Sequence, residues 1–281
     1  MATLTCDISE ELAEALERRS KTTGEATSEF VSRLLRRAFN KPLHTLFQVS
    51  TSRALVQGVY GEAVTGSYLL GHGNFGLGTF DELDGEMVIL DGSIYQVRSD
   101  GTVHHLSGDV GTPFATILNF TPDGDETLTK VKSLAELCAA CDKHRESQNL
   151  FYAFRVDGTF TAVHTRAMRR TQSGVSLKAA ASTQPEFEFA EIEGTLVGFW
   201  SPPFAGAVDI PGYHFHFLSA DHTRGGHLLD CAAGSLRLRW QSISDFHLSL
   251  PDTEEFLRAD LTADRSKDLS AAEGTHAKEK P

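Results

Sequence analysis

The sequence predicts an α+β protein that is predominantly β, with two β-rich halves and a small strand-helix-helix segment at the N-terminus. Three observations support this fold class. Short alternating runs separated by Asp-Gly turns fill most of the chain beyond Leu43. Few segments in that region have helical periodicity, whereas the residues before Leu43 contain two amphipathic helical patterns. We expect one half to hold a mixed or antiparallel sheet and the other a barrel-like sheet.

The first element is predicted to be a separate segment over residues 1–42. Residues 3–9 alternate apolar and polar like a short strand, and a helical pattern then runs from Ser9 to a stop at Gly24. A second helix fits residues 27–39, where apolar positions recur at helical spacing. This arrangement resembles a ribbon-helix-helix segment, which buries its apolar face by pairing with a second copy. We therefore expect a homodimer or a higher homo-oligomer.

The charge of this segment decides whether DNA is an expected partner. The segment holds seven Lys or Arg and seven Asp or Glu residues, hence no net charge, and Asp7 occupies an outward strand position. An acidic side chain facing the groove is unfavourable against phosphate. A dimerisation role is therefore favoured over residual DNA binding. We do not expect nucleic acid to be a partner of this protein.

Residues 43–281 are predicted to form one domain with halves at about 43–145 and 146–281. Two helices are clear, TSRALVQGVY over 51–60 and SLAELCAACDKH over 133–144, the latter near the boundary between the halves. The last ~20 residues are polar and would be a disordered tail by composition alone. The predicted strands include the runs DGEMVILDG, GSIYQVRSDG, TVHHLSGD, LFYAFRVDG and TFTAVHTRA.

The length and composition exclude several classes of protein. The 281 residues are 40 % hydrophobic, which is enough for a substantial core, and the net charge of -12 disfavours general binding to the nucleic-acid backbone. Residues 1–20 lack a cationic start followed by an apolar core, and no run reaches the ~20 apolar residues of a membrane span. We expect a soluble, cytoplasmic protein that does not bind membranes.

The four cysteines do not make a complete zinc ribbon. Cys138 and Cys141 form one CxxC pair, which lies in a helical pattern without a second pair downstream. Because a structural zinc site needs four ligands, we interpret the cysteines as small buried or half-buried thiols in preference to redox or metal groups.

A glycine-rich run that begins at Gly71, GHGNFGLGTF, contains the GxGxxG spacing of a dinucleotide-binding turn. That spacing has physical meaning only between a strand and a helix whose N-terminus receives the pyrophosphate. Here the glycines lead into a strand pattern, so we do not expect a nucleotide cofactor.

Four histidines crowd into GYHFHFLSADHTRGGHLLD, residues 212–230. On a strand, His214 and His216 project from the same face, and His227 begins a second apolar run after a turn. A hairpin would return this third imidazole to the first two, leaving coordination positions open as in a catalytic metal site. Ordinary core or surface histidines of a hairpin are the alternative on spacing alone. His222 lies in the presumed turn and is expected to face solvent.

Several longer motifs follow one another along the chain. They are HTLFQVST, HGNFGLGTFDELDGEMVILDGSIYQVRSDGTV, VHTRA, TQPEFEF, EGTLVGFWSP, GYHFHFL and GGHLLD. In this order and at these separations they resemble the bacterial and fungal α-acetolactate decarboxylases, over about residues 43–275. After Arg166 the chain departs from the family pattern, because it reads AMRRTQSGVSL where the family has a Val-Pro stretch and a Lys-Pro-Tyr segment. The segment before Leu43 is likewise outside the family pattern.

The resemblance implies an enzyme, a carbon-carbon lyase that uses zinc to convert (S)-2-acetolactate to (R)-acetoin and CO2 in acetoin biosynthesis. It implies that the zinc ligands are His214, His216 and His227. It also implies further site residues, with Glu86, Arg166 and Glu273 as catalytic groups, and Thr79 and Arg166 as substrate-binding groups. For Glu273 to reach the site, the C-terminal segment must fold back over it.

Two other functions remain as alternatives. A cupin-like metal oxygenase also presents HxH from a β-strand, but cupins follow that pair with a Glu ligand, and the corresponding window here offers only Asp221. A ligand-sensing DNA-binding regulator would use the N-terminal segment, but that segment is neutral and the remainder of the chain is acidic.

Overall fold

The computed structural model describes residues 5–23, 26–38 and 44–273. The chain divides into two compact units, Met1–Leu43 and His44–Pro281. Within the described ranges, no helix combines the length and the apolar composition that crossing a membrane requires.

The N-terminal unit contains the two helices that the sequence predicts, α1 (Glu10–Thr23) and α2 (Thr27–Ala38). The predicted strand over residues 3–9 is not found, because residues 5–9 have no regular secondary structure, and residues 3 and 4 lie outside the described part of the chain. A ribbon strand has ladder hydrogen bonds only beside a second strand, and the described residues of this unit contain none. Leu12 and Leu34 are 48 % and 44 % exposed, so these two apolar side chains are not covered within the unit.

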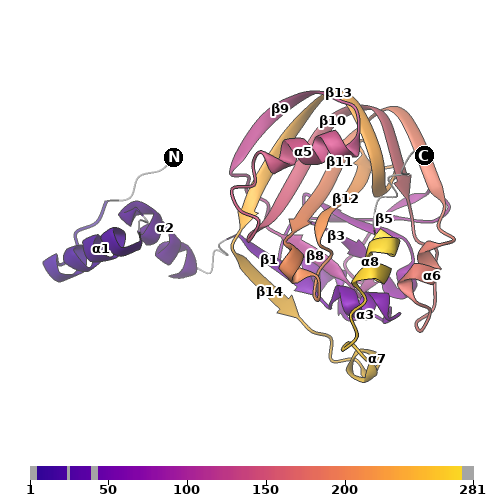
Figure 1. Cartoon of the computed structure of the whole chain (residues 1–281), viewed down its shortest axis with the longest axis horizontal. Coiled ribbons are helices and arrows are strands. Elements are labelled where there is room, and N and C mark those ends of the chain that lie inside the picture. Colours follow the sequence, from indigo (N-terminus) through magenta and orange to yellow (C-terminus); the bar gives the residue numbers. More distant parts are fainter. Residues whose placement is uncertain (1–4, 24–25, 39–43, 274–281) are drawn as a thin grey trace. The chain divides into compact units, whose positions relative to one another are not determined.

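A seven-stranded sheet forms one layer of the second unit (Figure 1). Its strand order is β14-β1-β8-β3-β4-β5-β6, and neighbouring strands are antiparallel except for the parallel pair of β1 and β14. The strands are β1 (Thr45–Val49), β3 (Phe75–Thr79), β4 (Glu86–Leu90), β5 (Ser93–Val97), β6 (Val103–Leu106), β8 (Ala115–Leu118) and β14 (Asp245–Ser249).

A predicted Asp-Gly turn forms a tight hairpin in this sheet. Asp91 and Gly92 join β4 to β5 with φ values of 51° and 80°, and Leu90 pairs with Ser93 across the turn. Positive φ at both central residues is the type I′ geometry, whose twist matches that of the flanking strands.

A five-stranded antiparallel sheet forms the second layer and curls into the barrel-like form that the sequence predicts (Figure 1). The order is β10-β11-β12-β13-β9, and β10 also pairs with β13, so that β10, β11, β12 and β13 close into a circuit. The strands are β9 (Gly124–Val131), β10 (Phe151–Arg166), β11 (Glu186–Ser201), β12 (Gly212–Ser219) and β13 (Gly225–Ile243).

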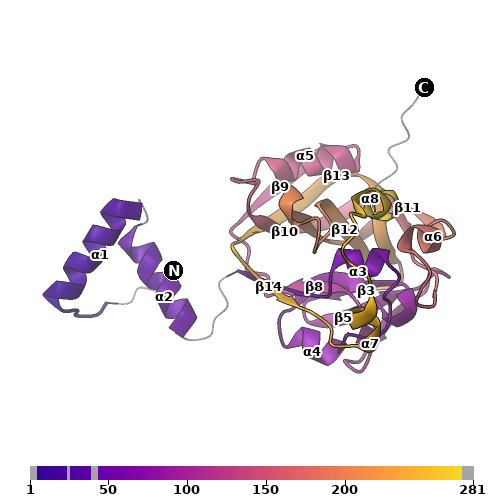
Figure 2. The same cartoon turned by 60° about the horizontal axis from the view of Figure 1, so that its bottom comes forward.

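Three helices, α3, α6 and α8, lie together at one end of the sheets (Figures 1 and 2). Side-chain caps begin α3 and α6, because Thr51 Oγ1 accepts from the Ala54 amide at 3.2 Å and Ser176 Oγ accepts from the Ala179 amide at 3.4 Å. The remaining elements are α3 (Ser52–Val56), α4 (Gly66–Leu70), α5 (Leu134–Asp142), α6 (Leu177–Ala181), α7 (Glu254–Arg258), α8 (Ser266–Glu273), the 3-10 turns η1 (Asp81–Leu83) and η2 (Pro203–Ala205), and the pair β2 (Val64–Thr65) and β7 (Gly111–Thr112).

The two sheets pack face to face around a shared core. One buried cluster joins Phe75 and Val88 of the seven-stranded sheet to Ala153 and Val197 of the barrel-like sheet. A second cluster fills the barrel-like sheet, and a third packs α3, α6 and α8 against Phe114. Burial of apolar surface between the layers therefore holds them at a fixed separation.

The cysteines are free thiols that behave mostly as predicted. Cys141 and Cys231 are buried in the core of the barrel-like sheet, and the half-buried Cys138 packs against them. Cys6 departs from the prediction because it is exposed.

The α+β, predominantly β fold class is confirmed, with two differences in detail. The sheets exchange strands across residue 145, since β9 lies in the barrel-like sheet and β14 returns to pair with β1 in the other. The helix predicted over 51–60 is limited to α3, because Gly58 takes the left-handed φ of +89° and redirects the chain. The glycine-rich run after Gly71 leads into β3, where its glycines allow β8 to approach closely.

Gly76→Ala is expected to destabilise the second unit. An ideal Cβ on Gly76 would lie 2.4 Å from the carbonyl oxygen of Thr116, which belongs to the neighbouring strand β8. Overpacking of this kind costs about 1–3 kcal/mol, so the urea midpoint of unfolding should fall. Gly234→Ala in β13 is the matched control, because a Cβ there meets nothing within 4 Å. Equal stabilities of the two variants would contradict this account.

Candidate active site

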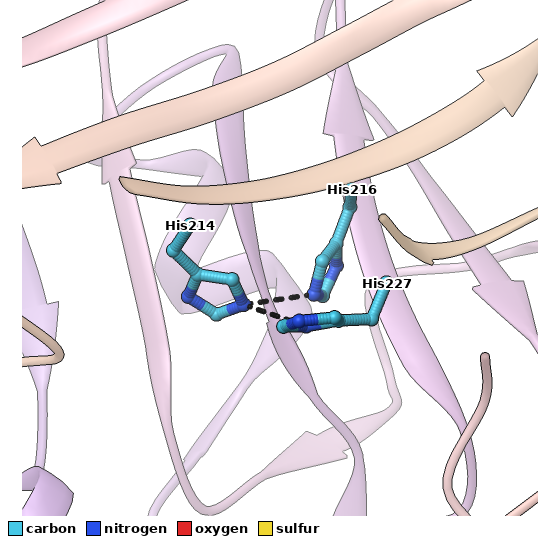
Figure 3. Close-up of side chains that lie close together, drawn as sticks. All are labelled: His214, His216 and His227. Carbon is cyan, nitrogen blue, oxygen red and sulfur yellow. Dashed lines mark hydrogen bonds between the residues drawn. The ribbon is translucent and has the colours of Figure 1, made fainter. Parts of the chain in front are cut away.

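Three histidines from the predicted hairpin converge in the second unit (Figure 3). His214 and His216 lie on β12, and His227 on β13 is the residue directly opposite His216. Nε2 of His214 lies 3.1 Å from Nε2 of His216 and 3.2 Å from Nδ1 of His227. Among the described residues, these three form the group whose ligand atoms are close enough to share a metal ion. His222 is exposed in the turn, as predicted.

The distances from Nε2 of His214 to the other two nitrogens fit a shared tetrahedral ion. Zinc-nitrogen bonds of about 2.0–2.1 Å place two ligand nitrogens about 3.3 Å apart, close to the observed separations. Nδ1 of His216 lies 2.8 Å from the carbonyl oxygen of Met87, so Nδ1 carries the hydrogen and Nε2 keeps its lone pair for a metal.

The protonation of the three rings also suits ligation. Burial lowers the pKa of His216 to about 4, with a contribution from Arg166 that is opposed by the hydrogen bond to Met87. Burial, together with Arg166 and the neighbouring imidazoles, lowers the pKa of His214 and of His227 well below the ordinary value. All three rings are therefore neutral at neutral pH, which is the form that binds metals.

Two carboxyl groups, one buried and one half-buried, approach the histidines from different elements. Oε2 of Glu86, the first residue of β4, lies 3.5 Å from Nε2 of His216, and its Oε1 accepts from the Met168 amide at 3.0 Å. Oε2 of Glu273, the last residue of α8, lies 3.7 Å from Nδ1 of His227. The seven-stranded sheet and the C-terminal helix thus each bring one acid to the ligand cluster.

Burial favours the neutral forms of both acids. It raises the pKa of Glu86 to about 8, an increase to which Glu273 adds and which Arg166 and the Met168 amide oppose. Burial also raises the pKa of Glu273, and Arg166 opposes that increase. A cation held by the imidazoles would lower both values, because it favours the charged carboxylates.

Arg166 connects the histidines to the C-terminal helix. It ends β10 opposite His227, is 4 % exposed, and its Nη2 donates to the carbonyl oxygen of Ala272 at 2.5 Å. The same Nη2 lies 3.3 Å from Nε2 of His227 and 3.8 Å from Oε2 of Glu273. The arginine therefore joins β10, β13 and α8 at one point.

The ordered C-terminal helix corrects the disordered tail that composition alone predicts. Residues 266–273 form α8, with Leu269 and Ala272 buried against α3 and α6. Two apolar side chains one turn apart anchor a segment whose other positions are polar. Residues 274–281 of the predicted tail lie outside the described part of the chain.

A narrow cavity, partly open to solvent, connects these groups. Thr79 of β3 lies in its wall and pairs in register with Glu86, and its hydroxyl donates to the carbonyl oxygen of Gly85 at 2.9 Å. The ionisable lining groups are the three histidines, Glu86, Arg166 and Glu273. Most of the remaining wall is apolar: Leu55, Leu83, Phe114, Met168, Leu177, Ala181, Ile210 and Ala272.

The segment after Arg166 supplies lining residues that sequence reasoning missed. Met168, Leu177, Ala181 and Gln184 all line the cavity, and the Met168 amide also holds Glu86. Because this segment departs from the family pattern, the resemblance did not indicate that its residues line the cavity. Gln184 lies in the recognised TQPEFEF motif, but no spacing rule pointed to its side chain.

Comparison with known proteins identifies similar chains over most of this sequence. A family model described as Alpha-acetolactate decarboxylase matches residues 46–263. A Methanosarcina mazei protein named alpha-acetolactate decarboxylase is 39% identical over 255 residues, covering 90% of this chain and 88% of that protein. A Brevibacillus brevis protein of the same name is 37% identical over 233 residues, covering 83% of this chain and 82% of that protein. The crystal structure of alpha-acetolactate decarboxylase from Bacillus subtilis strain 168 has a TM-score of 0.79 at 35% identity, covering 82% of this chain and 99% of that one.

Removing the Glu86 carboxyl should flatten the pH dependence of stability in chelator-treated protein. Because burial raises the folded pKa from 4.5 to about 8, the native state keeps a proton that the unfolded chain has lost between these values. This contribution to the free energy of unfolding is complete below pH 4.5 and is lost as pH rises through 8. Urea unfolding should show a loss of about 1 kcal/mol between about pH 7 and 8 that Glu86→Gln does not show.

The control for this measurement is Glu188→Gln, which changes an exposed carboxyl on β11. It should retain the wild-type pH dependence. A Glu86→Gln protein with that same dependence would contradict the raised pKa of Glu86.

Proposed function

Since this chain belongs to the alpha-acetolactate decarboxylase family, we propose that it converts (S)-2-acetolactate to (R)-acetoin and CO2 with a zinc ion bound by three histidines. Membership of the family makes the protein a decarboxylase, and hence a carbon-carbon lyase. The observation that best supports the proposed ligands is the convergence of His214, His216 and His227 beside Arg166 in one cavity.

Decarboxylation of a 2-hydroxy-3-oxo acid releases an electron pair that must be stabilised. When the carbon-carbon bond to the carboxylate breaks, the pair moves toward the neighbouring ketone and gives an enediolate with negative charge on oxygen. Zinc, when bound, supplies a Lewis acid that orients the hydroxyl and ketone oxygens and stabilises that charge. The protein must also hold the carboxylate and return a proton to carbon.

Arg166 is assigned to the substrate carboxylate or to the developing enediolate charge. Its guanidinium is permanently cationic and buried, so little water screens its attraction for an anion. The hydrogen bond from Nη2 to the Ala272 carbonyl fixes the side chain and leaves its other donors for substrate.

One of the two glutamates is assigned to proton delivery, which sets the chirality of the product. Glu86 and Glu273 lie 3.5 Å and 3.7 Å from ligand histidines, so either can reach a substrate bound there. A buried carboxyl that retains its proton near neutral pH can release it to carbon. Thr79 is assigned to substrate binding, because its hydroxyl oxygen keeps acceptor capacity while it donates to Gly85.

The alternatives have less support. Asp221, the acid closest after the HxH pair, is exposed and accepts hydrogen bonds from Ser219 and Thr223 of its own turn, so it does not act as a cupin ligand. A regulator would depend on the N-terminal unit, whose first 42 residues are neutral. We propose that this unit pairs with a second copy, since the exposed Leu12 and Leu34 need an apolar partner.

Purified protein mixed with racemic acetolactate should release acetoin and CO2, and a chelator should abolish the reaction. Zinc added back should restore it, because the imidazoles supply the ligand set and the metal stabilises the transition state. Acetoin formation and CO2 release measure the turnover. Acetoin production that a chelator does not affect would overturn the proposed role of the metal.

Two histidine variants complete this experiment. His214→Ala should lose both bound zinc and turnover, as measured by metal analysis and acetoin release. His222→Ala is the matched control from the same hairpin, and it should keep both because its ring is exposed in the turn. Full activity of a metal-free His214→Ala protein would contradict the ligand assignment.

Glu273→Gln should lower kcat by about 100-fold or more, the usual contribution of a positioned acid-base group. The amide keeps the size of the side chain, so α8 should remain folded and the thermal midpoint should change little. Comparing the steady-state kcat and KM of Glu273→Gln with those of Glu86→Gln would show which acid delivers the proton. Glu188→Gln, which changes an exposed carboxyl, is the control. Unchanged kcat and KM for Glu273→Gln would exclude α8 from the chemistry.

A further inference from the structure

Gln184 lines the cavity and carries a buried side-chain oxygen without a hydrogen-bond partner. Its Oε1 is enclosed and receives no hydrogen bond, although Gln184 lines the same cavity as the three histidines. Buried polar atoms in folded proteins nearly always have a hydrogen-bond partner, and an orphan costs about 1–3 kcal/mol. An orphaned acceptor on a residue that lines a ligand cavity can be satisfied by a donor that the ligand brings.

The backbone around Gln184 holds this carboxamide in place. The residue lies between α6 and β11, where Glu186 pairs in register with Arg166. The Ala167 amide donates to the carbonyl oxygen of Pro185 at 3.2 Å, and Nε of Arg169 donates to the carbonyl oxygen of Thr183 at 2.8 Å. The loop is therefore fastened on both sides of Gln184 to the segment that follows Arg166.

The chemistry of the cavity decides which substrate group meets this oxygen. Arg166 offers only donors, and the α6 residues that line the same cavity, Leu177 and Ala181, are apolar. A 2-hydroxy-3-oxo acid carries a carboxylate and a ketone, which accept hydrogen bonds, and one hydroxyl, which donates. The hydroxyl is therefore the substrate group that complements Oε1.

We propose that Gln184 accepts a hydrogen bond from the C2 hydroxyl of the substrate and makes the cavity selective for 2-hydroxy-3-oxo acids. This inference rests on the proposed function, because it takes the decarboxylated acid as the occupant of the cavity. Acids that carry a methyl group in place of the hydroxyl leave Oε1 unpaired, and a site built to bind a hydroxyl rejects such analogues.

A role in selectivity and a role in folding have opposite consequences for Gln184→Met. Met has a similar length and no polar atom, so the substitution removes a desolvated acceptor that has no partner in the folded protein. The thermal midpoint of the ligand-free protein should stay the same or rise. Selectivity for the hydroxyl should fall, because the substrate hydroxyl then meets an apolar surface.

The test compares two competitive inhibitors of the zinc-loaded enzyme, 2-hydroxy-2-methylpropanoate and its hydroxyl-free analogue 2,2-dimethylpropanoate. Their ratio of inhibition constants should fall about tenfold in Gln184→Met relative to wild type. Gln184→Glu keeps an acceptor and should retain the ratio. Its negative charge weakens the binding of both inhibitors, but it does so to a similar extent. Gln172→Met, at an exposed position of the same segment, is the matched control and should match wild type.

The outcomes separate this inference from the proposed function. Wild-type protein that makes no acetoin from acetolactate would overturn the proposed function and, with it, the role of Gln184. Active wild type with an unchanged inhibitor ratio in Gln184→Met would overturn the inference alone. A lowered thermal midpoint in Gln184→Met would assign the residue to folding. If the inhibitor ratio fell in Gln184→Glu as much as in Gln184→Met, the acceptor role of Gln184 would be excluded.

Discussion

The hydrogen bond between the His216 ring and the Met87 carbonyl is the contact on which the site depends. It joins β12 of the barrel-like sheet to β4 of the seven-stranded sheet at the point where the candidate ligands gather. Because Met87 follows Glu86 in β4, the same contact brings the Glu86 carboxyl to the His216 ring. The packing of the two sheets therefore sets the ring orientation, the ligand nitrogen and the position of an acid together.

Enclosure of the cavity acts on every ionisable group in it. Burial favours neutral forms, so it lowers the pKa of the imidazoles and raises the pKa of Glu86 and Glu273. Neutral imidazoles are the form that binds metals, and protonated carboxyls are the form that delivers protons. Arg166 differs because its guanidinium stays charged, and the Ala272 carbonyl compensates part of its lost hydration. Exclusion of water thus favours the neutral form of the imidazoles and the neutral form of the carboxyl groups.

Sequence reasoning reached the histidines more easily than the rest of the site. Residues two apart on a strand share a face, so spacing alone brought His214 and His216 together. Glu86 and Arg166 come from separate strands, and only the family resemblance pointed to them. Composition predicted a disordered tail because it cannot weigh the few apolar anchors of α8. The exchange of β9 and β14 between the sheets was beyond prediction as well, since long-range strand pairing leaves little trace in local patterns.

The order of assembly follows from how far apart in sequence these contacts lie. The histidine cluster closes over a separation of 13 residues between His214 and His227, whereas the bond from Arg166 to Ala272 spans 106 and that from His216 to Met87 spans 129. Short loops close early in folding and long ones late, because the entropy of closure grows with length. The histidine cluster is therefore local to one hairpin, whereas the contacts of Arg166 with α8 and of His216 with β4 exist only once distant parts of the chain have come together.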